Sequence, residues 1–202
     1  MASSASEIVD LTDTEHIEVR LSGFGGQGIL LAGYILGQAL TVYSHRAVVM
    51  AQSYGPESRG GASQVELIIS SGEISYPRVE HPNVVVALSQ QAYASYGATR
   101  PDEALLIVDT DLVTVDEALE GPRPVVAAPI TRWAEEKLGK RITANIVMLG
   151  FLCGLTGLVE PGALERAVVQ SAPKGSAELN TRALRIGLEQ ASSYRGERQG
   201  GS

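Results

Sequence analysis

The sequence predicts an α/β fold with a Rossmann-like, mostly parallel sheet that is flanked by helices and contains one β-hairpin. Three short aliphatic runs carry this prediction, because strands that are apolar along their whole length are typical of parallel sheets buried on both faces. The runs are NVVVAL at 83–88, ALLIV at 104–108 and PVVAA at 124–128. Segments with helical spacing of apolar residues alternate with strands along the chain, as in other parallel α/β folds.

The remaining elements follow from the same periodicities. In order they are a strand at 17–21, a glycine turn at 23–28, a helix at 29–42, a short buried strand at 47–51, a glycine-rich loop at 54–61, a hairpin of 63–70 with 73–75, and helices at 90–96, 133–138, 143–155, 161–170 and 177–190. The hairpin is inferred from Ser71-Gly72, a turn dipeptide between two β-prone segments.

The chain of 202 residues fits one domain. We expect a disordered leader at 1–15, a single α/β domain at 16–193 and a flexible tail at 194–202. The leader is small, polar and acidic, which does not fit a signal peptide. The longest apolar stretch, 142–159, is too short and too mixed for a membrane span. We therefore expect a cytoplasmic chain that does not contact a membrane.

Composition excludes several classes of function. The net charge of −7 disfavours a nucleic-acid partner, because such binding needs a basic face. The single cysteine, Cys153, excludes an internal disulfide and any iron–sulfur or zinc site built from several cysteines of this chain. The three histidines show no spacing typical of a metal site. We expect no metal site and no catalytic residue in this chain.

The first candidate site is a glycine cluster, GFGGQG, that matches G-x-G-x-x-G between a predicted strand and a predicted helix. Glycines let the backbone approach a ligand, and the following helix N-terminus favours an anion. Its candidate binding residues are Gly23, Gly25, Gly26, Gln27 and Gly28. The alternative is a tight strand–helix junction with no ligand. No carboxylate follows the next strand until Glu57, which counts against a dinucleotide enzyme.

The second candidate site is the glycine-rich loop YGPESRGG, which we expect near the same end of the sheet as the first cluster. An arginine beside bare glycine backbone suits a phosphate, a carboxylate or an acidic group of a partner. Alternatively, the arginine forms an ion pair with Glu57 or a neighbouring loop. The candidate residues are Tyr54, Gly55, Glu57, Arg59, Gly60 and Gly61.

The stretch ITANIVMLGFLCGLTGL is predicted to be a helix that is apolar almost all round. Such a helix is either central in its own domain or covered by another subunit. An exposed apolar helix would favour a subunit of an assembly. We expect Asn145, which lies in this helix, to be a structural hydrogen-bonding residue, and Cys153 to be a small core residue.

Taken together, several segments resemble the gamma subunit of 2-oxoacid:ferredoxin oxidoreductases over about residues 17–190. They are GFGGQGILLAGYILG, QSYGPESRGGASQVELIIS, ISYPRVEHPNVVVALSQQAY, ANIVMLGFLCGLTGLV and ELNTRAL. The SYGPESRGG form and the AGYILG helix are most similar to the 2-oxoglutarate (ketoglutarate) type. The order and spacing of the segments carry the resemblance, rather than any one motif.

The resemblance implies a complex that converts 2-oxoglutarate and coenzyme A to succinyl-CoA, carbon dioxide and reduced ferredoxin. It also implies thiamine diphosphate, Mg and iron–sulfur clusters in that complex. This chain lacks a thiamine GDG…N motif and has one cysteine, so we expect no cofactor on this chain alone. The implied partners are alpha and beta subunits, a small ferredoxin-like delta subunit, and ferredoxin as electron acceptor. The chain would thus be an oxidoreductase subunit, inactive alone, whose glycine loops hold coenzyme A or pack on a partner.

Two other functions stay open at this point. The first is a stand-alone nucleotide-binding enzyme of Rossmann type, against which the missing ribose carboxylate and the lack of a nucleophile–base pair both count. The second is a purely structural scaffold subunit whose glycine loops serve interfaces only. The sequence does not separate this scaffold role from an auxiliary role in coenzyme A binding.

Overall fold

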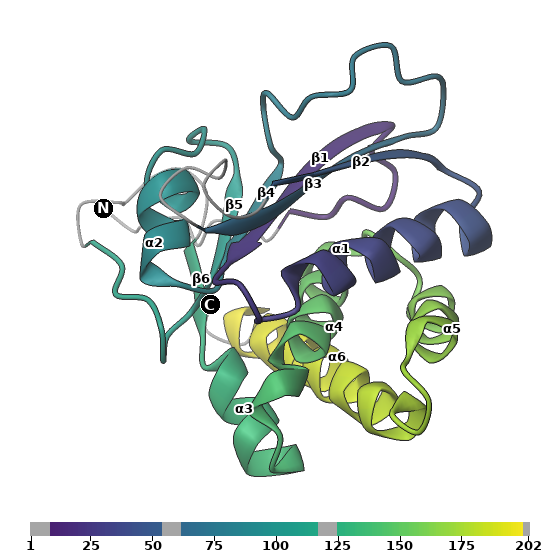
Figure 1. Cartoon of the computed structure of the whole chain (residues 1–202). Helices are drawn as coiled ribbons and strands as arrows, with labels where there is room; N and C mark the ends of the chain where they lie inside the picture. Colours follow the sequence, from purple (N-terminus) through teal and green to yellow (C-terminus); the bar gives the residue numbers. More distant parts are fainter. Residues whose placement is uncertain (1–8, 54–61, 117–124, 200–202) are drawn as a thin grey trace.

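Strand β1 (His16–Gly23) is central in a six-stranded sheet and pairs with neighbours of both directions (Figure 1). The computed structural model describes residues 9–53, 62–116 and 125–199. On one side β1 is parallel to β4 (Val84–Ala87), which continues in parallel to β5 (Leu105–Asp109) and β6 (Val125–Ala128). On the other side β1 is antiparallel to β3 (Ser63–Ser70), which is antiparallel to β2 (Ala47–Ser53). The predicted α/β fold with a mostly parallel sheet is confirmed.

The helices are divided unequally between the two faces of the sheet (Figure 1). One face packs against α1 (Ile29–Gln38), α4 (Ala144–Thr156) and α6 (Ala177–Gln199), with α3 (Ile130–Leu138) and α5 (Pro161–Ser171) beside them. The other face carries the short α2 (Gln90–Ala92) and the π-helical turn Tyr93–Gly97, which cover β4 and β5. Both faces of β4 are therefore buried, as its uninterrupted valines predict.

Helix α4 is the centre of the larger helical layer. Eleven of its thirteen residues are buried, and α6 runs against it at very close range. Added methyl groups at Gly150 and Gly187 would overlap with backbone atoms of the other helix, so these glycines let the two backbones touch. The helix is thus covered by this chain itself. The alternative, that it is exposed for another subunit to cover, is wrong. Among the described residues, no helix combines the length and apolar character needed to span a membrane.

The antiparallel part of the sheet differs from the prediction in two respects. The segment predicted as a short buried strand is β2, an edge strand whose seven residues are all at least partly exposed. The segment 63–70 does not form a hairpin with 73–75, which lie in no strand. Instead β3 pairs with β2 and β1, so the antiparallel pair consecutive in the chain is β2–β3. The Ser71-Gly72 turn leads into a long connection to β4 rather than into a partner strand.

Both ends of the domain extend further than expected. Leu11, in the predicted leader, is buried in the core, and its N–H donates to the carbonyl of Thr156 at 2.7 Å. The guanidinium of Arg46 donates to the carbonyls of Thr14 and Glu15 at 2.6 and 2.9 Å. Helix α6 continues to Gln199, through residues expected in the flexible tail. Its last turns are held because Arg195 donates to the carbonyl of Leu155 at 2.6 Å.

The contact between α4 and α6 gives a first prediction. We expect Gly187→Ala to lower the free energy of unfolding by about 1–3 kcal/mol, because the added methyl overlaps with the α4 backbone. Gly196→Ala lies on the same helix with no atom within 4 Å of the new methyl, and should be neutral or stabilising by up to about 1 kcal/mol. Urea unfolding of both variants measures the difference, and equal stability of the two would contradict the close packing.

Candidate functional site

The glycine cluster forms a tight turn between β1 and α1. Gly26 and Gly28 have φ values of 89° and 73°, a left-handed backbone that favours glycine. Gly28 is the N-cap of α1, where no side chain caps the helix and no acidic residue lies in the first turn. The first N–H groups of α1 are thus available to an anion. This is the local geometry that the G-x-G-x-x-G pattern predicts.

Two amide side chains hold this turn in place. The Oε1 atom of Gln27 accepts from the N–H of Phe24 at 2.5 Å, and its Nε2 atom donates to the carbonyl of Leu88 at 2.9 Å. The Nδ2 atom of Asn145, which is 4% exposed at the start of α4, donates to the carbonyl of Gly28 at 3.2 Å. Gln27 therefore links the turn to the end of β4, and Asn145 links it to α4. The prediction that Asn145 is a structural hydrogen-bonding residue is confirmed.

The turn borders a cavity of about 300 Å³ at the carboxyl ends of the parallel strands. The first turns of α3 and α4 meet there with the loop that precedes α1. The lining residues are Gly26, Gln27, Leu88, Thr131, Arg141, Ile142, Ala144 and Asn145. β1 lies between the parallel and the antiparallel half of the sheet, and open α/β sheets bind ligands at such a switch point.

A cation and an apolar side chain line the cavity, and a second apolar side chain is exposed in the adjoining glycine turn. Arg141 and Ile142 belong to the 3₁₀ turn Arg141–Thr143 that leads into α4, and both are exposed. Ile142 is 76% exposed and Phe24, in the glycine turn, is 48% exposed. A guanidinium beside a cavity bordered by helix N-termini suits an anionic group, and exposed apolar side chains suit a non-polar group. The sequence analysis did not select Arg141 or Ile142, because only the fold brings them beside the glycine turn.

The acidic residues near the cavity are engaged with other groups. Asp109 is fully buried as the last residue of β5, and its carboxylate accepts from the N–H and hydroxyl of Thr131 and from the N–H of Asp111. It thereby caps α3. Asp111 pairs with Arg132, whose guanidinium pKa is raised by this hydrogen bond and by the charge of the carboxylate. These two carboxylates therefore do not form an acid–base pair.

The second glycine cluster, with Tyr54, Gly55, Glu57, Arg59, Gly60 and Gly61, lies outside the described residues. The strand ends that flank it are described. Ser53 at the end of β2 pairs with Gln64, which pairs with Ser22 just before the first cluster. The end of β2 and the start of β3 therefore lie at the carboxyl edge of β1.

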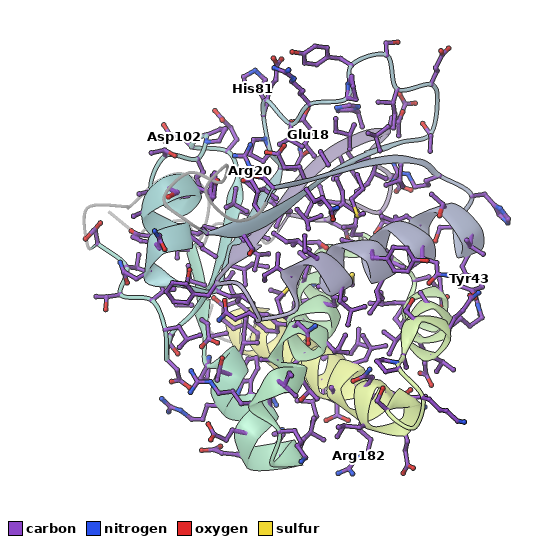
Figure 2. The ribbon with its side chains drawn as sticks, in the orientation of Figure 1. Glu18, Arg20, Tyr43, His81, Asp102 and Arg182 are labelled. Carbon is purple, nitrogen blue, oxygen red and sulfur yellow. The ribbon has the colours of Figure 1, made fainter. Side chains whose placement is uncertain are left out.

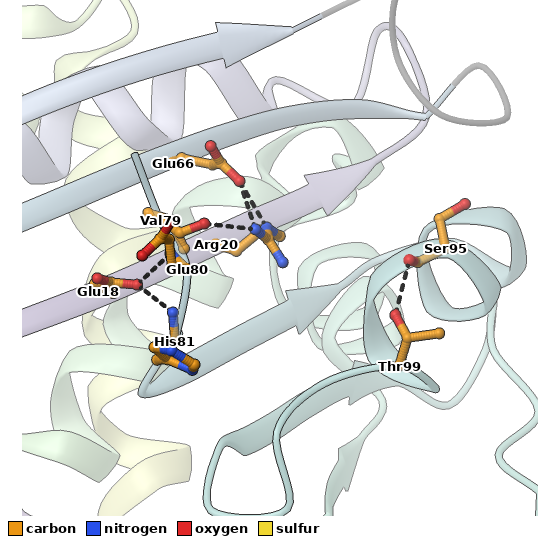
Figure 3. Close-up of polar contacts among 8 residues, drawn as sticks. All are labelled: Glu18, Arg20, Glu66, Val79, Glu80, His81, Ser95 and Thr99. Carbon is orange, nitrogen blue, oxygen red and sulfur yellow. Dashed lines mark hydrogen bonds and ion pairs between the residues drawn. The ribbon is translucent and has the colours of Figure 1, made fainter. Parts of the chain in front are cut away.

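The face of β1 and β3 opposite α1 carries polar contacts that were not expected from the sequence (Figure 2 and Figure 3). Arg20 donates through Nε and NH2 to Glu66 at 2.9 and 2.6 Å, and its guanidinium lies 5.3 Å from the centre of the Tyr96 ring. Glu18 accepts from the N–H groups of Glu80 and His81 at 2.8 and 2.7 Å. The alternation of Glu18 and Arg20 with apolar residues in β1 could have indicated these polar contacts from the sequence. The contacts of Glu18 hold the connection that follows β3. Arg20, Glu66 and Tyr96 line a polar cavity of about 370 Å³.

The described residues contain no cluster of three or more His, Cys, Asp and Glu side chains arranged for a metal ion. Cys153 is buried in α4, and burial raises the pKa of its thiol to about 12. The thiol is therefore protonated at neutral pH and lacks the thiolate that a nucleophile needs. The cavity by the glycine turn combines helix N-termini, a guanidinium and an apolar side chain, which suit an anion with an apolar portion.

Comparison with known proteins separates the oxidoreductase subunit from the stand-alone enzyme. Residues 18–190 match the family model of pyruvate ferredoxin/flavodoxin oxidoreductase. The chain belongs to this family. The resemblance to gamma subunits of 2-oxoacid:ferredoxin oxidoreductases is confirmed. The stand-alone nucleotide-binding enzyme is disfavoured, in agreement with the missing ribose carboxylate.

The similarity to individual family members extends over almost the whole domain. The 2-oxoglutarate synthase subunit KorC of Methanocaldococcus jannaschii is 47% identical over 174 residues, which cover 86% of this chain and 93% of that protein. The solved keto/oxoacid ferredoxin oxidoreductase gamma subunit of Geobacter sulfurreducens is 41% identical with a TM-score of 0.77, covering 88% of this chain and 99% of that one. A 2-oxoglutarate:ferredoxin oxidoreductase chain of Magnetococcus marinus shares the fold, with a TM-score of 0.76 at 20% identity. The match covers 90% of this chain and 32% of that chain.

The glycine turn yields a second prediction. Gly28→Ala should destabilise the chain more than Gly26→Ala, although both residues are left-handed. Each substitution adds backbone strain of about 1–2 kcal/mol. Only at Gly28 does the new methyl also displace Asn145, whereas no atom lies within 4 Å at Gly26. Urea unfolding measures both, and equal losses in the two variants would show that Asn145 does not hold the turn.

Proposed function

We propose that this chain is the gamma-type subunit of a 2-oxoglutarate:ferredoxin oxidoreductase. The observation that carries the proposal is the 47% identity to a 2-oxoglutarate synthase subunit that matches this chain over 93% of its own length. The reaction oxidatively decarboxylates 2-oxoglutarate with coenzyme A. It yields succinyl-CoA and carbon dioxide, and the released electron pair passes to ferredoxin.

The redox cofactors of this reaction do not fit the residues of this chain. An iron–sulfur cluster needs several cysteine ligands, and the sequence has one cysteine, which is buried among apolar residues of α4. The sequence also lacks the GDG…N pattern typical of thiamine diphosphate sites. We therefore assign thiamine diphosphate, Mg and the clusters to partner subunits of alpha and beta type, and to a small ferredoxin-like delta subunit. No redox step is assigned to side chains of this chain.

We further propose that the cavity beside the glycine turn holds part of coenzyme A. Its phosphates are anions suited to the N-terminus of α1 and to Arg141, and its pantetheine arm has apolar portions suited to Ile142 and Phe24. The residues of this chain then bind and orient the acyl acceptor and do not react with it. The glycine cluster with Arg59 stays part of this proposal, as a second contact with coenzyme A or with a partner.

Reconstitution tests the subunit assignment. We expect the purified chain alone to show no reduction of methyl viologen with 2-oxoglutarate and coenzyme A. The chain combined with its alpha, beta and delta partners should show this activity, and omission of this chain should abolish coenzyme A-dependent turnover. Pyruvate in place of 2-oxoglutarate serves as the control for the substrate class. Activity of the isolated chain, or faster turnover of pyruvate than of 2-oxoglutarate, would refute the assignment.

Arg141 gives the prediction for the coenzyme A site. Removal of one charge-assisted hydrogen bond in Arg141→Ala should raise the KM for coenzyme A about tenfold to a hundredfold, with little change in kcat. Arg182→Ala, on exposed α6 surface away from the cavity, removes the same charge and should leave the KM unchanged. An unaltered KM in Arg141→Ala would remove this residue from the site.

The same kinetic measurement extends to the segment 54–61. Arg59→Lys keeps the charge but cannot reproduce the two-pronged contact of a guanidinium. A raised KM for coenzyme A with intact assembly supports a contact with coenzyme A, whereas loss of a subunit supports a contact with a partner. Wild-type values of both would exclude Arg59 from either role.

A further inference from the structure

Strand β2 forms an unusually open edge of the sheet. It pairs with β3 on one side and is the terminal strand on the other. All seven of its residues are at least partly exposed, whereas β1 and β3 are largely buried. The outer backbone N–H and C=O groups of β2 therefore have no strand partner among the described residues. Such a row of groups is a ready template for pairing with another strand.

The sequence of β2 lacks the devices with which proteins usually protect an edge. The strand reads AVVMAQS, with no charged residue, no proline and no glycine. Exposed edges are normally blunted by charges, prolines, bulges or very short strands. The opposite edge of the sheet is protected by length, because β6 has four residues. A seven-residue uncharged edge with a 38% exposed methionine at its centre is typical of a strand that pairs with another chain.

We propose that β2 pairs antiparallel with β2 of a second copy of this chain, about a two-fold axis through Met50. Two residues directly opposite each other in an antiparallel pair either both point their backbone N–H and C=O groups toward the partner strand or both point them away. The two-fold axis therefore passes through one residue position rather than between two neighbouring positions. Of the possible centres, Met50 alone pairs all seven residues. It places Met50 opposite Met50, Val49 opposite Ala51, Val48 opposite Gln52 and Ala47 opposite Ser53. The two six-stranded sheets then become one continuous sheet.

The composition of β2 favours a copy of itself over a different chain. In a two-fold pairing every charge near the axis meets its own copy, so a charged strand repels itself. The uncharged β2 avoids this repulsion, and the pairing sets Val49 against the smaller Ala51 on one face and Met50 against its own copy on the other. The nearest preceding charge, Arg46, is turned toward the carbonyls of Thr14 and Glu15. An axis perpendicular to the sheet also keeps α1 of both copies on the same face, beside Met50.

A single cysteine tests the register. Residues directly opposite in an antiparallel pair have Cα atoms about 4.5–5.5 Å apart, within the range that a disulfide spans. We expect Met50→Cys in the full chain to form a disulfide-linked dimer under mild oxidation. Cys153 does not interfere, because it is buried and its thiol pKa is about 12. The matched control is Tyr76→Cys, at a residue that is 54% exposed but lies in the connection after β3. It should stay monomeric on a reducing-agent-free gel.

A charge exchange tests the pairing without a covalent bond. Met50→Lys places two cations opposite each other, and we expect the dimer dissociation constant, measured by light scattering or sedimentation, to rise by about tenfold or more. Met50→Glu should do the same, and an equimolar mixture of the two variants should restore the dimer. Circular dichroism melting confirms that each variant is folded. This test needs no enzyme activity, so its failure leaves the proposed function untouched.

Three results would overturn the proposal. The first is a folded Met50→Cys chain that stays monomeric on oxidation. The second is equal cross-linking of the Tyr76→Cys control, which would show that the disulfides form by random collision of chains rather than by pairing of β2. The third is a disulfide or zero-length cross-link from position 50 to another subunit in the reconstituted complex, which would show that a different chain covers the edge.

Discussion

The contact between the backbones of α4 and α6 determines where the other helices and the binding edge lie. Gly150 and Gly187 face each other without side chains, and Gly154 lies against Ala191 one turn further on. Helices normally pack with side chains between them at axis separations of about 8–10 Å. With side chains in this contact, α4 would move away from α6 toward the sheet. Its N-terminus would then no longer meet the glycine turn at the distance that lets Asn145 reach Gly28.

The contact between α4 and α6 positions the groups at the carboxyl edge of the sheet. Asn145 and Gln27 hold the turn after β1, Asp109 caps α3, and the turn before α4 brings a cation and an isoleucine to the same cavity. Each of these groups comes from a different stretch of the chain. They meet because the carboxyl ends of parallel strands share one edge, and because β1 divides the parallel from the antiparallel half of the sheet. The edge thus brings hydrogen-bond donors and a positive charge together at one cavity.

The parts that sequence reasoning predicted correctly are those in which local pattern and tertiary environment agree. The aliphatic runs of β4 and β5 are buried on both faces, and the glycine turn has the left-handed residues that its pattern implies. The run of β6 departs from this expectation, because β6 is an edge strand and exposes Ala127. The incorrect predictions concern residues whose environment depends on contacts far away in the sequence. AVVMA in β2 has the composition of a buried strand, but its place at the edge depends on β3 inserting between β2 and β1. Leu11 is held by Thr156 from the far end of α4, a contact that no local window contains.

For the site, the sequence identified the glycine turn but not its surroundings. Arg141 and Ile142 carry no motif, and they gain their significance only from the position of the turn that precedes α4. The all-apolar helix around Asn145 left two alternatives because composition alone does not tell a central helix from an interface helix. The glycines at 150, 154 and 187 were the sequence feature that could have indicated a helix packed within its own chain. Small residues spaced by four along a helix allow a neighbouring helix of the same chain to approach closely.

The two surfaces assigned to this chain are geometrically compatible. Ladder hydrogen bonds lie perpendicular to the strands, so a second copy on β2 lies beside the sheet and leaves the strand ends open. A two-fold axis perpendicular to the sheet reverses the strand direction in the second copy. The two carboxyl edges, each with its glycine turn, then face opposite ways. Pairing through β2 therefore leaves the carboxyl edge of each copy, with its cavity of about 300 Å³, unobstructed by the other copy.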